Sequence, residues 1–163
     1  GGDGEMQAVK SDDNLKVTLP KNEFTRDGYK FDGWSSVKGS AQVEFEDEDG
    51  PIDLRYTDTL YAVWEPYELT LKFNRNGAKS GNVSQMPVSF GSSVKLPENN
   101  FEKDNYNFDG WSLTENGDTL NNVVSATELV DKAPTSDGTT VTLDAQWVGK
   151  KFNVHLNLNV QDI

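Results

Sequence analysis

The side chains that could carry chemistry in this sequence are mostly carboxylates. The 163 residues include no cysteine and one histidine, His155, so neither a cysteine–histidine pair nor a histidine-based zinc site can form. A pair of carboxylates could act as general acid and base, and Asp32 and Asp109 occur in matching contexts. They fall in separate copies of a repeat, where a turn carboxylate that accepts backbone N–H groups is the favoured interpretation. We therefore expect no catalytic residue, no cofactor and no enzymatic activity.

The acidic stretch EFEDEDGPID at residues 44–53 is the strongest candidate for a metal site. Its aspartates Asp47, Asp49 and Asp53 offer the oxygen ligands that calcium prefers. The stretch lacks the full spacing of a calcium-binding loop and its terminal glutamate. We interpret it as a solvated loop, expect no metal site, and keep the three aspartates as weak calcium candidates.

The charge of the chain bears on its partners. The formal net charge is −12, from 27 acidic and 15 basic residues, and such a surface repels nucleic acid and anionic lipid. No apolar run approaches the roughly 20 residues of a membrane span, so we expect no membrane insertion. The absence of cysteine is compatible with either redox compartment.

The elements that must position these side chains are mostly strands. Polar and apolar residues alternate in YELTLKF (67–73) and FNVHLNLNV (152–160), which is the period of half-buried strands. One helix is expected within residues 125–134. Ser125 is its N-cap, Glu128 completes a capping box, and Pro134 follows its end.

Two copies of one unit make up most of the chain. YKFDGW at 29–34 recurs as YNFDGW at 106–111, and VTLPKNEF (17–24) recurs as VKLPENNF (94–101) with the same offset of 77. Downstream, TLYAVW (59–64) matches TLDAQW (142–147) with an offset of 83, so the second copy carries a six-residue insertion. Each copy thus holds two of the four tryptophans.

Two positions in each unit predict a local backbone conformation that favours glycine. A bulge at Gly33 would let Phe31 and Trp34 share one face of a strand. Gly28 precedes that strand at a turn that needs a positive φ, and Asn105 replaces it in the second copy.

The sequence begins and ends at different points of the repeat unit. Residues 150–160 lie as far beyond Trp147 as the strand of residues 67–73 lies beyond Trp64, so they resemble the first strand of a third copy. The first copy starts at GGDGEM, which corresponds to the turn after that strand, and its own first strand is missing. Open sheet edges recruit strands, so residues 152–160 could exchange into the first copy of a neighbouring molecule. The alternative is an exposed tail.

The pattern GYKFDGW…TLYAVW and NYNFDGW…TLDAQW resembles the Listeria–Bacteroides repeat, the B-repeat of internalin B and of other large bacterial surface proteins. The resemblance implies small β-grasp-like modules in surface-anchored or secreted proteins. The fold class expected is therefore α+β, mostly β. Residues 1–66 form repeat 1 without its first strand, residues 67–148 form repeat 2, and residues 149–163 hold the first strand of a truncated third repeat.

The recurring aromatic residues are expected to form the core of each unit, because both copies must build the same core. The expected core residues are Phe24, Tyr29, Phe31, Trp34 and Trp64 in the first copy and Phe101, Tyr106, Phe108, Trp111 and Trp147 in the second. The alternative is a sugar-binding platform of exposed tryptophans.

The function expected is a non-catalytic extracellular repeat module of a bacterial cell-surface or secreted protein, acting as a spacer, a stalk or an adhesion module. Its partner would be a host-surface protein or glycan. The alternative is a carbohydrate-binding accessory module of a secreted polysaccharide-degrading enzyme, and a calcium-dependent adhesin is a weaker third option.

Overall fold

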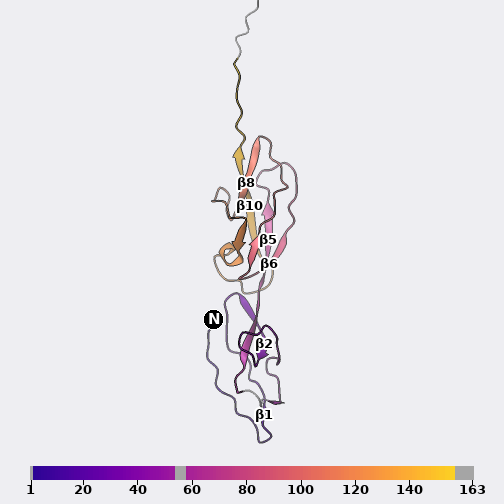
Figure 1. Ribbon diagram of the computed structural model, residues 1–163, viewed down its shortest axis with the longest axis vertical. Coiled ribbons are helices and arrows are strands. Elements are labelled where there is room, and N and C mark those ends of the chain that lie inside the picture. Colours follow the sequence, from indigo (N-terminus) through magenta and orange to yellow (C-terminus); the bar gives the residue numbers. More distant parts are fainter. Residues whose placement is uncertain (1, 54–57, 157–163) are drawn as a thin grey trace, which may run out of the picture.

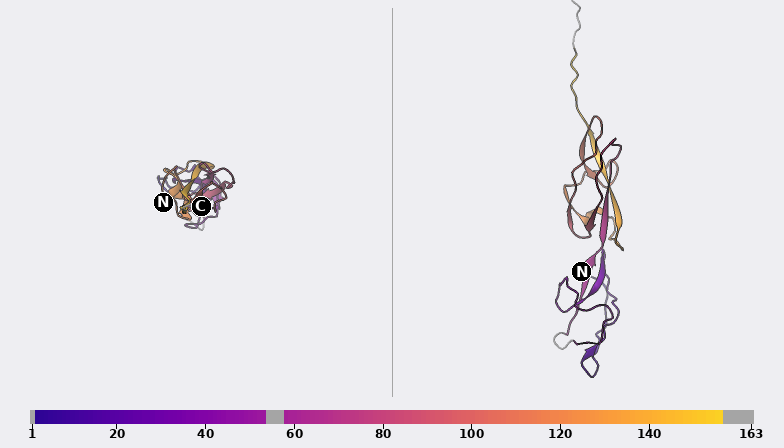
Figure 2. Two further views of the ribbon diagram at one scale, coloured as in Figure 1. Left: turned by 90° about the horizontal axis from the view of Figure 1, so that it is seen from above. Right: turned by 90° about the vertical axis from the view of Figure 1, so that its right-hand side faces the viewer.

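The computed structural model describes residues 2–53 and 58–156, and its regular secondary structure there is almost all strand, in agreement with the mostly-β prediction. The two repeats lie end to end in an elongated molecule, with residues 150–156 extending from the far end of repeat 2 (Figures 1 and 2). Repeat 1 contains β1 (Lys16–Val17), β2 (Tyr29–Ser35), β3 (Ile52–Asp53) and β4 (Tyr61–Pro66). Repeat 2 contains β5 (Glu68–Asn74), β6 (Met86–Ser89), β7 (Ser93–Lys95), β8 (Tyr106–Ser112), β9 (Val123–Ser125) and β10 (Thr139–Gly149).

Repeat 2 is built on a four-stranded sheet with the order β6-β5-β10-β8. The two central strands, β5 and β10, are parallel, with Leu71 opposite Val141 and Phe73 opposite Leu143. The outer strands β6 and β8 are antiparallel to their neighbours. This sheet packs a continuous apolar core in which Leu69 is fully buried.

Repeat 1 has a smaller sheet and a thinner core. Its β4 pairs with β2 in the way that β10 pairs with β8, but within the described residues no strand occupies the place that β5 takes beside β10. Of its apolar side chains in the described ranges, three are buried: Leu19, Trp34 and Val63. The buried core of repeat 2 has fifteen, so the first unit is much less completely packed than the second.

The bulge predicted at Gly33 is confirmed. The register of β2 against β4 shifts between Phe31 and Gly33, and Gly33 has a φ of +143°. As a result the rings of Phe31 and Trp34 meet edge to face with centroids 5.0 Å apart. A Cβ on Gly33 would lie 2.5 Å from Val43 Cγ1, which adds a steric reason for glycine. Asn105 adopts a φ of +63°, as expected for its turn.

The helix expected over residues 125–134 is a single 3₁₀ turn, Ala126–Leu129. Ser125 is its N-cap as predicted, and its hydroxyl accepts the N–H of Thr127. The chain returns to an extended conformation at Val130, so the capping signal was correct and the expected length was wrong. One turn provides too few backbone hydrogen bonds to sustain a helix without tertiary packing.

The segment of residues 150–156 forms no strand in the single chain, contrary to the sequence-based expectation. It is extended, and its apolar side chains are exposed: Phe152 by 84%, Val154 by 70% and Leu156 by 93%. Residues 157–160 of the strand predicted at 152–160 lie outside the described residues. A strand needs a neighbour to form its hydrogen bonds, and the single chain offers this segment none among the described residues.

Candidate functional site

The tryptophans of each repeat lie inside the unit rather than on a platform. Trp34 and Trp111 are 6% and 3% exposed. Trp64 and Trp147 are half-buried, and each meets a phenylalanine of the neighbouring strand edge to face. The buried rings of Trp34 and Trp111 are therefore not accessible for stacking on a sugar. This placement disfavours the carbohydrate-binding alternative.

The six other residues of the predicted core divide into two groups. Phe24, Phe31, Phe101 and Phe108 pack edge to face against the buried tryptophan of their own repeat. The tyrosines lie elsewhere: Tyr29 is at the junction of the repeats, where its ring meets Phe90 at 6.0 Å, and Tyr106 is 42% exposed. The prediction of a core position for Tyr106 was therefore wrong: its ring lies at the surface of repeat 2, where Lys103 Nζ lies 4.8 Å from the ring centre.

The weak calcium candidates have structural partners in repeat 1. Asp47 accepts the backbone N–H of Asn22 at 2.8 Å, and the carbonyl oxygen of Asp49 accepts the N–H of Leu19 at 2.8 Å. Asp53 pairs with Lys16 across β1 and β3 at 3.6 Å. Among residues 2–53 and 58–156, no three acidic or histidine side chains gather closely enough to hold a metal ion. The contacts of this stretch are those of a loop tied to its own repeat.

The remaining candidates for chemistry are far apart. Asp32 and Asp109 are exposed at the bulges of β2 and β8, one in each repeat. His155 is exposed in the 150–156 segment. The structure therefore brings none of these three groups together, and no pair is placed for proton transfer between two side chains.

The junction of the repeats is held by backbone hydrogen bonds. A single residue, Tyr67, separates β4 from β5, so the backbone runs almost without interruption from one repeat into the next. The N–H of Tyr67 donates to Gly28 O at 3.0 Å, and its carbonyl accepts the N–H of Phe90 at 2.9 Å. Both repeats therefore hydrogen-bond the connecting residue, which restrains bending at this point.

Charged groups of both repeats form ion pairs at the same junction. Lys30 of repeat 1 contacts Glu65 at 3.1 Å and Asp137 of repeat 2 at 3.2 Å. The backbone N–H of Glu68 donates to Asp137 at 2.9 Å. That hydrogen bond, and secondarily Lys30, lowers the pKa of Asp137. The hydrogen bonds to Glu65 and Asp137 raise the pKa of Lys30. Lys30 and Asp137 are distant in sequence, and the second copy of the YKFDGW motif has Asn107 in place of Lys30, so no sequence signal indicated this pair.

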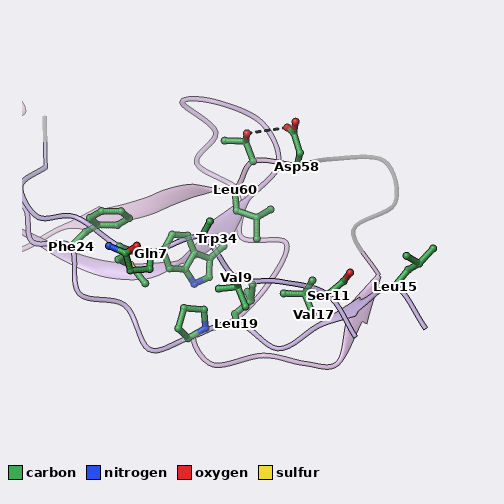
Figure 3. A pocket seen from close by; sticks show the side chains of 14 residues that line it. Gln7, Val9, Ser11, Leu15, Val17, Leu19, Phe24, Trp34, Asp58 and Leu60 are labelled. Atoms are coloured by element: carbon green, nitrogen blue, oxygen red, sulfur yellow. Dashed lines mark hydrogen bonds between the residues drawn. The ribbon is translucent and has the colours of Figure 1, made fainter. Parts of the chain in front are cut away.

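A groove runs along repeat 1 (Figure 3). It has a volume of about 770 Å³, and its walls are mainly apolar, with Met6, Val17, Leu19, Trp34 and Leu60 among them. Asp58 is the acidic residue in the lining. The sequence predicted an open sheet edge in this repeat, but gave no sign of a groove on this scale.

Comparison with known proteins supports the internal repeat. The family model of the Listeria-Bacteroides repeat domain matches residues 1–63 and again residues 69–146. The chain belongs to this family. The resemblance read from the two tryptophan motifs is therefore confirmed, and Listeria-Bacteroides repeats are found in bacterial surface proteins.

Two similar proteins come from Evansella cellulosilytica. One, named "Putative membrane protein", is 27% identical over 162 residues, which cover 99% of this chain and 22% of that protein. The other, named "Putative Gly-rich membrane protein", is 29% identical over 101 residues, which cover 61% of this chain and 11% of that protein. This Listeria-Bacteroides repeat pair thus spans about a fifth or less of the length of these relatives. No solved structure matches the chain significantly.

The part of the chain that the structure describes contains no helix long and apolar enough to cross a membrane.

Proposed function

We propose that the repeat pair is a non-catalytic, extracellular spacer or stalk of a bacterial cell-surface or secreted protein. The observation that carries this proposal is the junction, where one residue connects two units that lie end to end (Figure 1). The fourteen residues from Tyr61 to Asn74 are extended through both units, and at about 3.3 Å per residue they alone span roughly 45 Å. Each added repeat would lengthen the stalk with little bending.

A spacer differs from a flexible linker in that the motion of one repeat against the other is restrained at the junction. Tyr29 is held between the ring of Phe90 and the guanidinium of Arg26, which lies 3.7 Å from the tyrosine ring centre. Side chains packed in this way oppose rotation of one repeat against the other. A stalk benefits from this property because its reach is not lost to coiling.

The repeats are proposed to be β-grasp-like modules. The sheet order β6-β5-β10-β8, with a parallel central pair and an antiparallel first hairpin, supports that arrangement. The region between β8 and β10 carries the short 3₁₀ turn in repeat 2.

An adhesion role is the second candidate, since many weak sites on one chain gain avidity. The groove of repeat 1 is the feature that favours it, because the lining is concave and apolar. Its ligand would be a host-surface protein or glycan.

Binding measurements distinguish the two roles. The labelled chain is titrated against a panel of glycans, mucins and host-cell surfaces, with and without calcium. A spacer shows no saturable binding to any member of the panel. Saturable binding would overturn the spacer role in favour of adhesion, and a calcium requirement would direct attention to residues 44–53.

A further inference from the structure

Two glycine-containing turns face each other at the junction of the repeats. In repeat 1, the turn of residues 26–29 leads into β2, and in repeat 2, the turn of residues 89–92 joins β6 to β7. Each turn is closed by a backbone hydrogen bond of 3.1 Å between its last and first residues. The third residue of each is a glycine with a positive φ, +80° for Gly28 and +81° for Gly91. The two repeats therefore meet through turns of the same kind.

Each of these glycines lies beside an aromatic side chain of the other repeat. A Cβ on Gly28 would lie 2.1 Å from two carbon atoms of the Phe90 ring, which is too close for any real Cβ. A Cβ on Gly91 would lie 2.7 Å from the hydroxyl oxygen of Tyr29. The two rings also meet edge to face, with centroids 6.0 Å apart. Gly28, Tyr29, Phe90 and Gly91 thus form one reciprocal contact, which we call the junction cluster.

The backbone alone does not require glycine at position 28. The equivalent residue of repeat 2, Asn105, has a φ of +63°, and its carbonyl accepts the N–H of Lys150 at 2.7 Å. The carbonyl of Gly28 accepts the N–H of Tyr67 in the same way at 3.0 Å. Asparagine therefore supports both the turn and its hydrogen bond, because it tolerates the left-handed conformation. What distinguishes Gly28 is the ring of Phe90, which leaves no room for a Cβ.

The other half of the cluster is also specific to one copy. The motifs on either side of Phe90 and Gly91 align the two repeats with offsets of 80 and 77, so these residues correspond to positions within residues 10–14. That stretch of repeat 1 is KSDDN, which contains neither an aromatic residue nor a glycine. Each copy therefore supplies a different half of the junction cluster, and the two repeats are not interchangeable at this contact.

The ion pair at the junction is too exposed to fix the orientation by itself. The side chains of Lys30 and Asp137 are 37% and 50% exposed. Exposed ion pairs contribute little to stability, because the charges interact weakly in water and two long side chains lose their freedom. Gly28, in contrast, is buried and Phe90 is half-buried. A closely packed contact of this kind does not accommodate even one added carbon atom without a shift.

We propose that the junction cluster fixes the orientation of one repeat against the other, and that glycine at position 28 restricts this end of a repeat to a neighbouring unit with a Phe–Gly turn. A side chain at position 28 displaces the Phe90 ring, and the displaced ring loses its contact with Tyr29. A repeat with asparagine at this position, as in Asn105, therefore does not accept the same neighbour in the same orientation. The inference rests on the proposed spacer role and adds to it the residues that determine which repeats can follow each other rigidly.

Asparagine is the substitution that isolates the effect of the Cβ, because it tolerates a positive φ. Gly28→Asn introduces into repeat 1 the residue that repeat 2 has at this position. Gly39→Asn is the matched control, since Gly39 lies in the same repeat, has a φ of +78° and has no atom within 4 Å of its Cβ position. Phe90→Ala removes the ring from the opposite side of the contact. Amide chemical shifts remote from the junction verify that both repeats are folded in each variant.

Residual dipolar couplings of the backbone amides report the orientation of the repeats. In a weakly aligning medium, the couplings of both repeats should fit a single alignment tensor in the wild type and in Gly39→Asn. Gly28→Asn should require two tensors of different magnitude, because its repeats move independently. A Gly28→Asn variant that keeps the single tensor would overturn the role of the cluster. A wild type that already requires two tensors would overturn the fixed stalk as well, whereas saturable ligand binding would count against the spacer role without changing the tensors.

A double-mutant cycle shows whether the effect comes from the Phe90 ring. In urea denaturation, Gly28→Asn should raise the unfolding equilibrium constant of repeat 1 about tenfold more than Gly39→Asn does. In the Phe90→Ala background this excess should disappear, because the new Cβ then has space. An equal excess in both backgrounds would overturn the proposal, since the cost would then arise within repeat 1 and not from its contact with repeat 2.

Discussion

Repeat 1 is expected to unfold before repeat 2 when the 163-residue chain is monomeric. In repeat 2, Leu69 and Leu71 of β5 are fully buried, and burial of a leucine side chain contributes about 1.5–3 kcal/mol. Together they provide about 3–6 kcal/mol that has no counterpart among the described residues of repeat 1. A difference of this size separates the two transitions in urea, with an intermediate in which repeat 2 alone is folded.

The perturbation is Leu71→Ala, which removes a fully buried side chain from the centre of repeat 2. Large-to-small changes of this kind cost about 2–5 kcal/mol. That cost is comparable to the advantage of repeat 2, so the two transitions should approach each other or merge. The control is Leu15→Ala, because Leu15 is 56% exposed and its loss removes little burial.

The assay uses the four tryptophan side chains, two in each repeat. Their indole N–H signals are followed by NMR through a urea titration of the 163-residue chain. The account predicts that Trp34 and Trp64 lose their folded signals at lower urea than Trp111 and Trp147, and that Leu71→Ala shifts the second pair alone. Coincident loss of all four signals in the parent protein would refute the reasoning.

Three further substitutions test local features. Gly33→Ala should destabilise repeat 1 by about 1–3 kcal/mol, because φ is +143° and the new Cβ meets Val43, whereas Gly39→Ala, in open space, should cost less; urea denaturation of both variants compares them. Asn105→Gly should be nearly neutral and Asn105→Ala should cost about 1–2 kcal/mol, since the φ of +63° disfavours a Cβ-bearing side chain that lacks asparagine's local hydrogen bonds; equal costs would contradict this explanation. Because the pKa of Asp137 is lowered, its contribution to stability is complete above the ordinary aspartate pKa and is lost as the pH falls through the folded value. Melting temperatures of the wild type and Asp137→Asn should therefore converge in acid, and a gap independent of pH would contradict this assignment.

Much of the fold could be predicted from the sequence, because the same spacing of residues occurs in both copies and each copy supports the interpretation of the other. The same spacing of Phe31, Gly33 and Trp34 in β2 and of their equivalents in β8 predicted the bulge and the internal position of the tryptophans. The positive φ at Asn105 followed from the position of Gly28 in the first copy. Local rules were sufficient here, since each of these features depends on residues close together in the chain.

Other features depend on contacts that no local pattern encodes. Lys30 and Asp137 meet only because the two repeats are stacked, and the exposure of Tyr106 depends on which residues pack around it in space. The capping signal at Ser125 indicated where the 3₁₀ turn begins, but no sequence pattern indicated that it ends at Leu129. The groove is likewise lined by residues far apart in the chain, such as Met6, Trp34 and Leu60, which no local pattern brings together.

The central claim is that the junction holds two Listeria-Bacteroides repeats in one fixed end-to-end arrangement. Because the chain has no cysteine, spin labels can be placed at single introduced cysteines in each repeat, such as Lys21→Cys and Lys132→Cys, both at exposed positions. Pulsed electron paramagnetic resonance should then give one narrow distance distribution, which broadens when Tyr29→Ser removes the ring between Arg26 and Phe90. A broad distribution in the labelled parent protein, unchanged by Tyr29→Ser, would contradict the account.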